Sequence, residues 1–179
     1  NLVRTLESMG AEVALPPISE WVNYVTLIRK KRNRQRGNIM DSMKDLMIEK
    51  YLYSIEKKTA SKAGMKPEAT PAELLDIASP YMHESFTGEA VLSIGKTIEY
   101  IVESGAAGVI NVMPFTCMPG TIVTALLKKI HEDYDGFPCI SLAYAGQQNL
   151  NIRTRLEAFM YQARENWKKN RAGKKRISI

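Results

Sequence analysis

Two segments without a charged residue constrain the fold of this 179-residue chain more than any other feature. They read AAGVINVMPF at 106–115 and FPCISLAY at 137–144. A strand that is apolar on both faces is typical of a parallel sheet covered by helices. The segment between them, GTIVTALLKKIHEDY at 120–134, has the pattern of a helix. We therefore predict that both uncharged segments are buried strands of an α/β protein.

Helical patterns and one further strand pattern fill much of the remaining chain. The strand pattern is AEVALPPI at 11–18, which ends at two prolines. The alternation of helices and strands predicts a Rossmann- or flavodoxin-like parallel sheet with helices on both faces. The predicted helices occupy residues 1–9, 19–36, 39–58, 70–79, 87–102, 120–134 and 152–169.

The start of the chain predicts that a preceding segment is missing. It begins with Asn1 rather than Met, and its first helix and strand make half of a βαβ unit. We expect a single α/β domain over residues 1–166, truncated at its N-terminus and belonging to a larger protein. The open sheet edge that the missing strand leaves favours a homo-oligomer. Residues 167–179 are expected to form a disordered basic tail.

Several helices have local signals in the sequence. Thr70 followed by Pro71 and Glu73 predicts a capped helix start, because the Thr side chain and the Glu carboxylate can bond each other's backbone N–H. Ser19 is the predicted N-cap of the helix over 19–36. The helix over 39–58 carries a methionine-rich apolar stripe, which we expect to face the core or another helix.

The net charge of +6 comes from two basic runs. RKKRNRQR at 29–36 and KKNRAGKKR at 168–176 carry six cations each, and the remainder of the chain is net acidic. Such runs attract phosphate, nucleic acid or CoA, although a helix C-terminus and a solvated tail also explain them. No aromatic residues are interleaved with them, so nucleic-acid binding is the less favoured interpretation.

The two cysteines, Cys117 and Cys139, do not make a disulfide framework and favour a reducing, cytoplasmic setting. No run of residues approaches the roughly 18 to 20 apolar residues of a membrane helix, and no signal peptide is visible. We therefore expect a cytoplasmic protein with no membrane partner.

Cys117 is the main candidate for chemistry. It follows the first uncharged strand and precedes a helix, and ligands of open α/β sheets bind beyond the carboxyl ends of strands. A helix N-terminus favours the thiolate, the form that binds metal or attacks carbon. Gly120 and Thr121 are the candidate cofactor-binding residues beside it, because glycine permits close backbone approach. An ordinary half-buried thiol remains the alternative, and Cys139 is expected in the core.

Three stretches resemble one family closely: GVINVMPFTCMPGTIVTALLKKI, FPCISLAYAGQQNLNIRTRLEAFMYQAR and SPYMHESFTGEAVLSIGKTIEYI. The chain is similar to the 2-hydroxyacyl-CoA dehydratase and benzoyl-CoA reductase component family. More specifically, it looks like the dehydratase-like terminal region of large CoA-substrate-specific enzyme activases. The resemblance covers residues 1–163, with MPFTCMPGT and NIRTRLEAFMYQAR as its most specific parts.

The resemblance implies a cytoplasmic protein of anaerobic metabolism that works in iron–sulfur electron transfer. Family members hold a [4Fe–4S] or double-cubane cluster with three cysteines between Rossmann-like subdomains, and an actin-like ATPase unit drives an electron onto it. The electron serves 2-hydroxyacyl-CoA dehydration, as in 2-hydroxyglutaryl-CoA dehydratase. By this resemblance Cys117 is a candidate cluster ligand, and the other ligands lie outside this chain. The fragment alone is expected to be inactive and to hold no cluster.

Four other residues are candidate substrate-binding residues. His83 lies in a loop beside Glu84, and Gln147 lies in the loop after the second uncharged strand. Arg153 and Arg155 lie near a predicted helix N-terminus, where cations are unfavourable, so an anionic partner such as a phosphate or Glu157 is expected. Capping or solvated roles remain the alternatives for His83 and Gln147.

Two further interpretations of the whole chain stay open. One is a structural, dimerising domain without a catalytic site. The other, which is less favoured, is a nucleic-acid-binding module that uses the basic runs. An acyl-CoA dehydratase component is the partner expected if the family resemblance holds.

Overall fold

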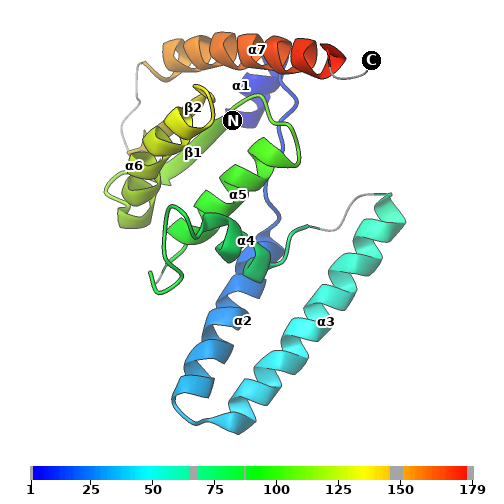
Figure 1. Ribbon diagram of the computed structural model, residues 1–179. Helices are drawn as coiled ribbons and strands as arrows, with labels where there is room; N and C mark the ends of the chain where they lie inside the picture. The colour runs from blue at the N-terminus through cyan, green and yellow to red at the C-terminus, as the bar shows by residue number, and fades with distance from the viewer. Residues whose placement is uncertain (1, 65–67, 87, 146–150, 177–179) are drawn as a thin grey trace.

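The computed structural model describes residues 2–64, 68–86, 88–145 and 151–176 (Figure 1). Five helices precede the first strand, one helix connects the two strands, and one helix follows the second strand. The two strands coincide with the two uncharged segments. The elements are α1 (Leu2–Ser8), α2 (Ile18–Gln35), α3 (Ile39–Ala63), α4 (Pro71–Ala78), α5 (Ala90–Val102), β1 (Val109–Pro114), α6 (Met118–Asp133), β2 (Cys139–Tyr144) and α7 (Ile152–Arg176).

The sheet consists of β1 and β2, which pair in parallel. Val109 lies opposite Cys139 at one end of the ladder, and Pro114 lies opposite Tyr144 at the other. The prediction of parallel strands joined through a helix is confirmed. The described residues form these two strands only, so a wider Rossmann-like sheet remains a prediction.

Helices cover both faces of this sheet. One core, toward α6, contains Val123, Leu127 and Ile130 of that helix together with buried residues of α2, α4 and α5. The other core, toward α1 and α7, contains Leu142 of β2 packed with Leu156 and Phe159 of α7 and with residues of α1. Strand β2 supplies Leu142 and Ile140 to the second core and Cys139 to the edge of the first, whereas β1 supplies Ile110 to the second core. The prediction that both strands are buried is wrong for β1, because all six of its residues are half-buried or exposed.

The strand prediction for residues 11–18 is wrong. Residues 11–17 have no regular secondary structure, and α2 begins at Ile18 with Pro17 as its N-cap in place of the expected Ser19. A strand needs a partner for its backbone hydrogen bonds, and neither β1 nor β2 pairs with this segment. The two prolines also remove backbone donors.

The prediction for Thr70 is confirmed in detail. Its hydroxyl accepts a hydrogen bond from the Glu73 backbone N–H at 3.3 Å, and the Glu73 carboxylate accepts one from the Thr70 N–H at 2.6 Å. Pro71 occupies the first turn of α4. These contacts satisfy two backbone donors that a helix start otherwise leaves without partners.

Helices α2 and α3 form a hairpin that extends away from the sheet (Figure 1). The methionine-rich stripe of α3 does not face the core as expected, because Met40, Met43 and Met47 are 73%, 62% and 71% exposed. At the other end of the chain, α7 continues to Arg176. Residues 167–176 are therefore helical where a disordered tail was expected, and 177–179 lie outside the described residues.

Candidate functional site

Cys117 is the N-cap residue of α6, immediately beyond the carboxyl end of β1. The carboxyl end of β2 lies beside it, because the Phe115 N–H donates a 2.8 Å hydrogen bond to the Tyr144 carbonyl oxygen. The Cys117 carbonyl oxygen accepts bonds from the N–H and the hydroxyl of Thr121, at 3.0 and 2.9 Å. The half-buried Cys117 thiol makes no capping hydrogen bond with α6.

The backbone just before Cys117 is strained. Thr116 has a φ of 67°, a conformation that a β-branched residue rarely adopts. Such conformations cost about 1–3 kcal/mol and occur preferentially at functional sites. The turn that connects β1 to Cys117 is thus held in this conformation at an energetic cost.

A polar network fixes the first turns of α6 against the sheet. The Asn111 Nδ2 atom on β1 lies 3.3 Å from the Gly120 carbonyl oxygen, the Thr124 hydroxyl and the Ser141 hydroxyl. The Thr124 hydroxyl also donates a 2.9 Å hydrogen bond to that of Ser141 on β2. These contacts tie both strands to the helix that starts at Cys117.

Gly120 has a packing role in the structure. A Cβ atom added at this position would lie 2.6 Å from Met113 Cβ and 2.5 Å from its sulfur. The absence of a side chain therefore lets α6 approach β1 closely. Helix packing therefore accounts for a glycine at this position without any bound ligand. The sequence pattern had instead indicated that Gly120 permits the close approach of a cofactor.

Cys139 lies at the opposite end of the strands and cannot share a site with Cys117. It is the first residue of β2, whereas Cys117 follows the last residue of β1. A strand rises about 3.3 Å per residue, so the strand ends are separated by roughly 16 Å. Burial raises the pKa of the Cys139 thiol to about 12, so the thiol stays protonated at neutral pH. The prediction that Cys139 belongs to the core is confirmed.

The candidate arginines lie on α7, and only Arg155 reaches the sheet. Its Nη2 atom donates a 2.8 Å hydrogen bond to the Ser141 carbonyl oxygen. The Arg153 Nε–H donates to the Glu157 carboxylate at 3.1 Å, one of the two anionic partners that the sequence favoured. Residue Gln147 lies outside the described residues.

His83 belongs to a different part of the molecule. Its Nδ1 atom accepts a hydrogen bond from the Ser85 N–H at 3.1 Å and lies 2.8 Å from the Ser85 hydroxyl. The loop that holds it contacts α2, because Glu84 pairs with Lys31 at 2.5 Å. No contact in the described part of the chain joins His83 to Cys117.

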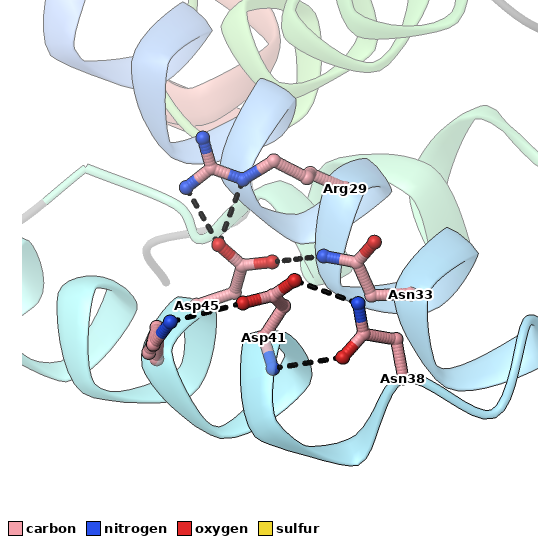
Figure 2. Close-up of polar contacts among 6 residues, drawn as sticks. Arg29, Asn33, Asn38, Asp41 and Asp45 are labelled. Atoms are coloured by element: carbon pink, nitrogen blue, oxygen red, sulfur yellow. Dashed lines mark hydrogen bonds and ion pairs between the residues drawn. The ribbon is translucent and has the colours of Figure 1, made fainter.

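The basic run at 29–36 has a structural role in the hairpin. The Arg29 guanidinium pairs with Asp45 at 2.6 Å, Lys30 pairs with Glu49, and Lys31 pairs with Glu84. Figure 2 shows Arg29 and Asn33 of α2 each donating to a different carboxylate oxygen of Asp45 of α3. Half of the six cations in this run are therefore neutralised within the chain, which weakens the nucleic-acid interpretation.

Sequence reasoning missed a buried ionic cluster around Lys96 of α5. Its ammonium group lies 3.0 Å from Glu20 and 2.7 Å from Glu99 and also contacts Glu68, while its side chain is 5% exposed. Burial alone would lower the pKa of Lys96, but hydrogen bonds to the three carboxylates outweigh it and raise the pKa. Burial also raises the pKa of the Glu20 carboxyl. The sequence of α5 did not indicate this cluster, because its spacing of apolar residues predicts only an amphipathic helix.

A shallow hollow of about 450 Å³ lies between the end of α6 and α7. Its lining includes His131, Pro138 and Tyr161. Pro138 immediately precedes β2, so the hollow lies at the amino end of the strands, away from Cys117.

Among the described residues, no three His, Cys, Asp or Glu side chains gather in an arrangement that could hold a metal ion. None of the described helices combines the length and the apolar character needed to cross a bilayer. Comparison of the chain with protein-family models, curated proteins and solved structures found no match.

Proposed function

We propose that this chain is the dehydratase-like part of a CoA-substrate-specific enzyme activase, and that Cys117 supplies one thiolate to an iron–sulfur site. Its partners in this proposal are an actin-like ATPase unit, an acyl-CoA dehydratase component and the chain segment that carries the remaining ligands. The proposal extends the two-stranded α/β unit to a Rossmann-like domain in the complete protein.

The observation that supports this function best is the position of Cys117. Its thiol lies at the carboxyl edge of two parallel strands and at a helix N-terminus, and it makes no capping hydrogen bond. The strained Thr116 precedes it. The two most specific stretches of the family resemblance, 113–121 and 151–164, are joined through the sheet. Arg155 bonds the Ser141 carbonyl oxygen, and Asn111 contacts both the Ser141 hydroxyl and the Gly120 carbonyl oxygen.

The described residues fit one part of a shared cluster site and do not fit a self-contained one. Both thiols are half-buried, but Cys117 lies at the carboxyl edge of the strands, whereas Cys139 packs against a core at their opposite end. Iron–sulfur clusters need several such ligands, so others must come from outside the described residues. A cluster bound there would supply one-electron transfer. The chain's own contribution is to orient the Cys117 sulfur through α6 and its polar network.

The experiment is anaerobic purification of the longest natural chain that contains residues 1–179, followed by iron and sulfide analysis and electron paramagnetic resonance. We expect iron in the wild type and a loss of at least about half of it in Cys117→Ala, because a missing thiolate opens the cluster to solvent. The matched variant Cys139→Ala should keep the iron and the spectrum. Equal iron in Cys117→Ala and wild type would refute the proposal, as would a wild type without iron.

A further inference from the structure

The α2–α3 hairpin has its polar side on the inside. Where the two helices meet, Asn23 of α2 donates a 3.0 Å hydrogen bond to Glu56 of α3. Nearer the turn, Lys30 pairs with Glu49, and Asp45 is 3% exposed beneath Arg29 (Figure 2). Packed helices normally bury their apolar faces against each other. In this hairpin the helix contact includes ion pairs and amide hydrogen bonds.

The apolar face of α3 points away from α2. Its centre is formed by Met40, Met43, Met47 and Tyr51, which we call the Met stripe. These residues recur at steps of three and four, so they share one side of the helix. Met47 and Tyr51 are 71% and 68% exposed, respectively. Further exposed apolar side chains of α3 are Ile39, Leu46, Ile48, Tyr53 and Ile55.

This face is too large to be scattered surface hydrophobics. Burial of one Met, Ile or Leu side chain removes roughly 100 Å² of apolar surface from water. The four side chains of the Met stripe are 62–73% exposed and therefore present roughly 300 Å², and contiguous apolar patches of that size are often functional. Met side chains adapt their shape to a partner, which suits them to bind a helix.

The charges around the Met stripe are positive. The acidic residues of α3 are occupied within the hairpin: Asp41 by Lys44 and Asn38, Asp45 by Arg29 and Asn33, Glu49 by Lys30, and Glu56 by Asn23. By contrast, Lys50, Lys57 and Lys58 are exposed, and no carboxylate in the described part of the chain pairs with them. Two copies of this face would bring lysines together, which is unfavourable.

We propose that the Met stripe is the docking surface for an acidic amphipathic helix of a partner protein. The apolar side of that helix covers Met43, Met47 and Tyr51, and its flanking carboxylates pair with Lys50 and Lys57. Charge complementarity sets the preference for an acidic partner, and the apolar area supplies the affinity. This inference concerns a different surface from Cys117 and does not depend on the iron–sulfur proposal.

The test uses designed peptides of about 18 residues, or five helical turns, with leucines along one face. One peptide carries glutamates on the remaining positions, and a matched peptide carries lysines. Isothermal titration to the full chain should give saturable micromolar binding of the acidic peptide and at least roughly tenfold weaker binding of the basic peptide, a difference of about 1.4 kcal/mol. Equal binding of the two peptides, or none by either, would overturn the proposal.

Point variants locate the binding. Met47→Glu should weaken the acidic peptide at least tenfold, because it places a carboxylate in the apolar stripe. Val102→Glu is the matched control, since Val102 is 65% exposed at the end of α5, and it should bind like the wild type. Equal weakening by both variants would contradict the assignment of the surface. Circular dichroism checks that both variants are folded.

Two other occupants are tested with the same variants. Light scattering that shows a wild-type dimer and a Met47→Glu monomer would identify a second copy as the occupant and overturn the proposal. Sedimentation with anionic phospholipid vesicles that Met47→Glu abolishes, without any binding of the acidic peptide, would identify a lipid surface and overturn it as well. A wild type that is monomeric, does not sediment with vesicles and binds the acidic peptide supports the proposal.

Discussion

Replacement of Lys96 with methionine is expected to lower the free energy of unfolding by about 3–5 kcal/mol at neutral pH, because it leaves buried carboxylates without their cation. Lys96 is the common partner of Glu20, Glu68 and Glu99, and both Glu20 and Glu99 are under a tenth exposed. Methionine keeps most of the side-chain volume, so the loss reports charge rather than a cavity. Urea unfolding followed by circular dichroism measures it.

The loss of stability in Lys96→Met should depend on pH. Burial already raises the pKa of Glu20, and the Lys96 cation partly offsets this by lowering it. Removal of that cation should therefore raise the pKa of Glu20 further. A carboxyl with a raised pKa in the folded state costs stability once it must ionise, so the loss should grow as pH rises above about 4.3. Lys96→Met should therefore be less destabilising at acidic pH than at pH 7. The double variant Lys96→Met with Glu20→Gln should recover part of the loss. A loss that is small and independent of pH would contradict this role of Lys96.

Gly95→Ala is expected to destabilise the protein by about 3 kcal/mol, the upper part of the range for overpacking. A Cβ atom at this position would lie 2.3 Å from the Leu74 carbonyl oxygen and 3.0 Å from its carbonyl carbon. These are backbone atoms of α4, and Leu74 is fully buried, so neither helix can yield without moving the core. Thermal and urea unfolding of the variant measure the effect.

The control for this variant is Ser93→Ala on the exposed side of α5. Alanine is a better helix former than glycine by about 1 kcal/mol, so a Gly95→Ala variant free of steric conflict would be more stable than the wild type. Ser93→Ala should change stability by less than about 0.5 kcal/mol. If Gly95→Ala were more stable than the wild type, the close approach of α5 to the Leu74 backbone of α4 would be contradicted.

Local chemistry made part of this fold predictable from sequence. The capping box at Thr70 needs residues only three positions apart, and its geometry is confirmed. The two uncharged segments likewise predicted the parallel strands and the packing of Cys139 against a core. They overstated the burial of the strands, because Leu142 is the only strand residue in the described part of the chain that is fully buried. The proposed edge position of Cys117 followed from the order of strand and helix.

The failures concern contacts that are distant in sequence. Residues 11–17 have the composition of a strand, but a strand also requires a neighbour to pair with, and composition does not supply one. Lys96 lies next to Thr97 and Ile98 in an apolar helix, and its partners Glu20 and Glu68 are far from it along the chain. The polar contact between α2 and α3 was also unpredictable, because apolar residues occur around much of α3 and do not mark the side that meets α2.

The central functional claim is that the Cys117 sulfur at the sheet edge binds iron, and alkylation of the two thiols tests it most directly. In the anaerobically purified longest natural chain, mass spectrometry should find Cys117 protected from iodoacetamide until a chelator removes the iron, and rapidly modified afterwards. Cys139 should stay unmodified throughout, because it packs against a core and burial raises the pKa of its thiol to about 12. Alkylation of Cys117 at the same rate before and after iron removal would contradict the account.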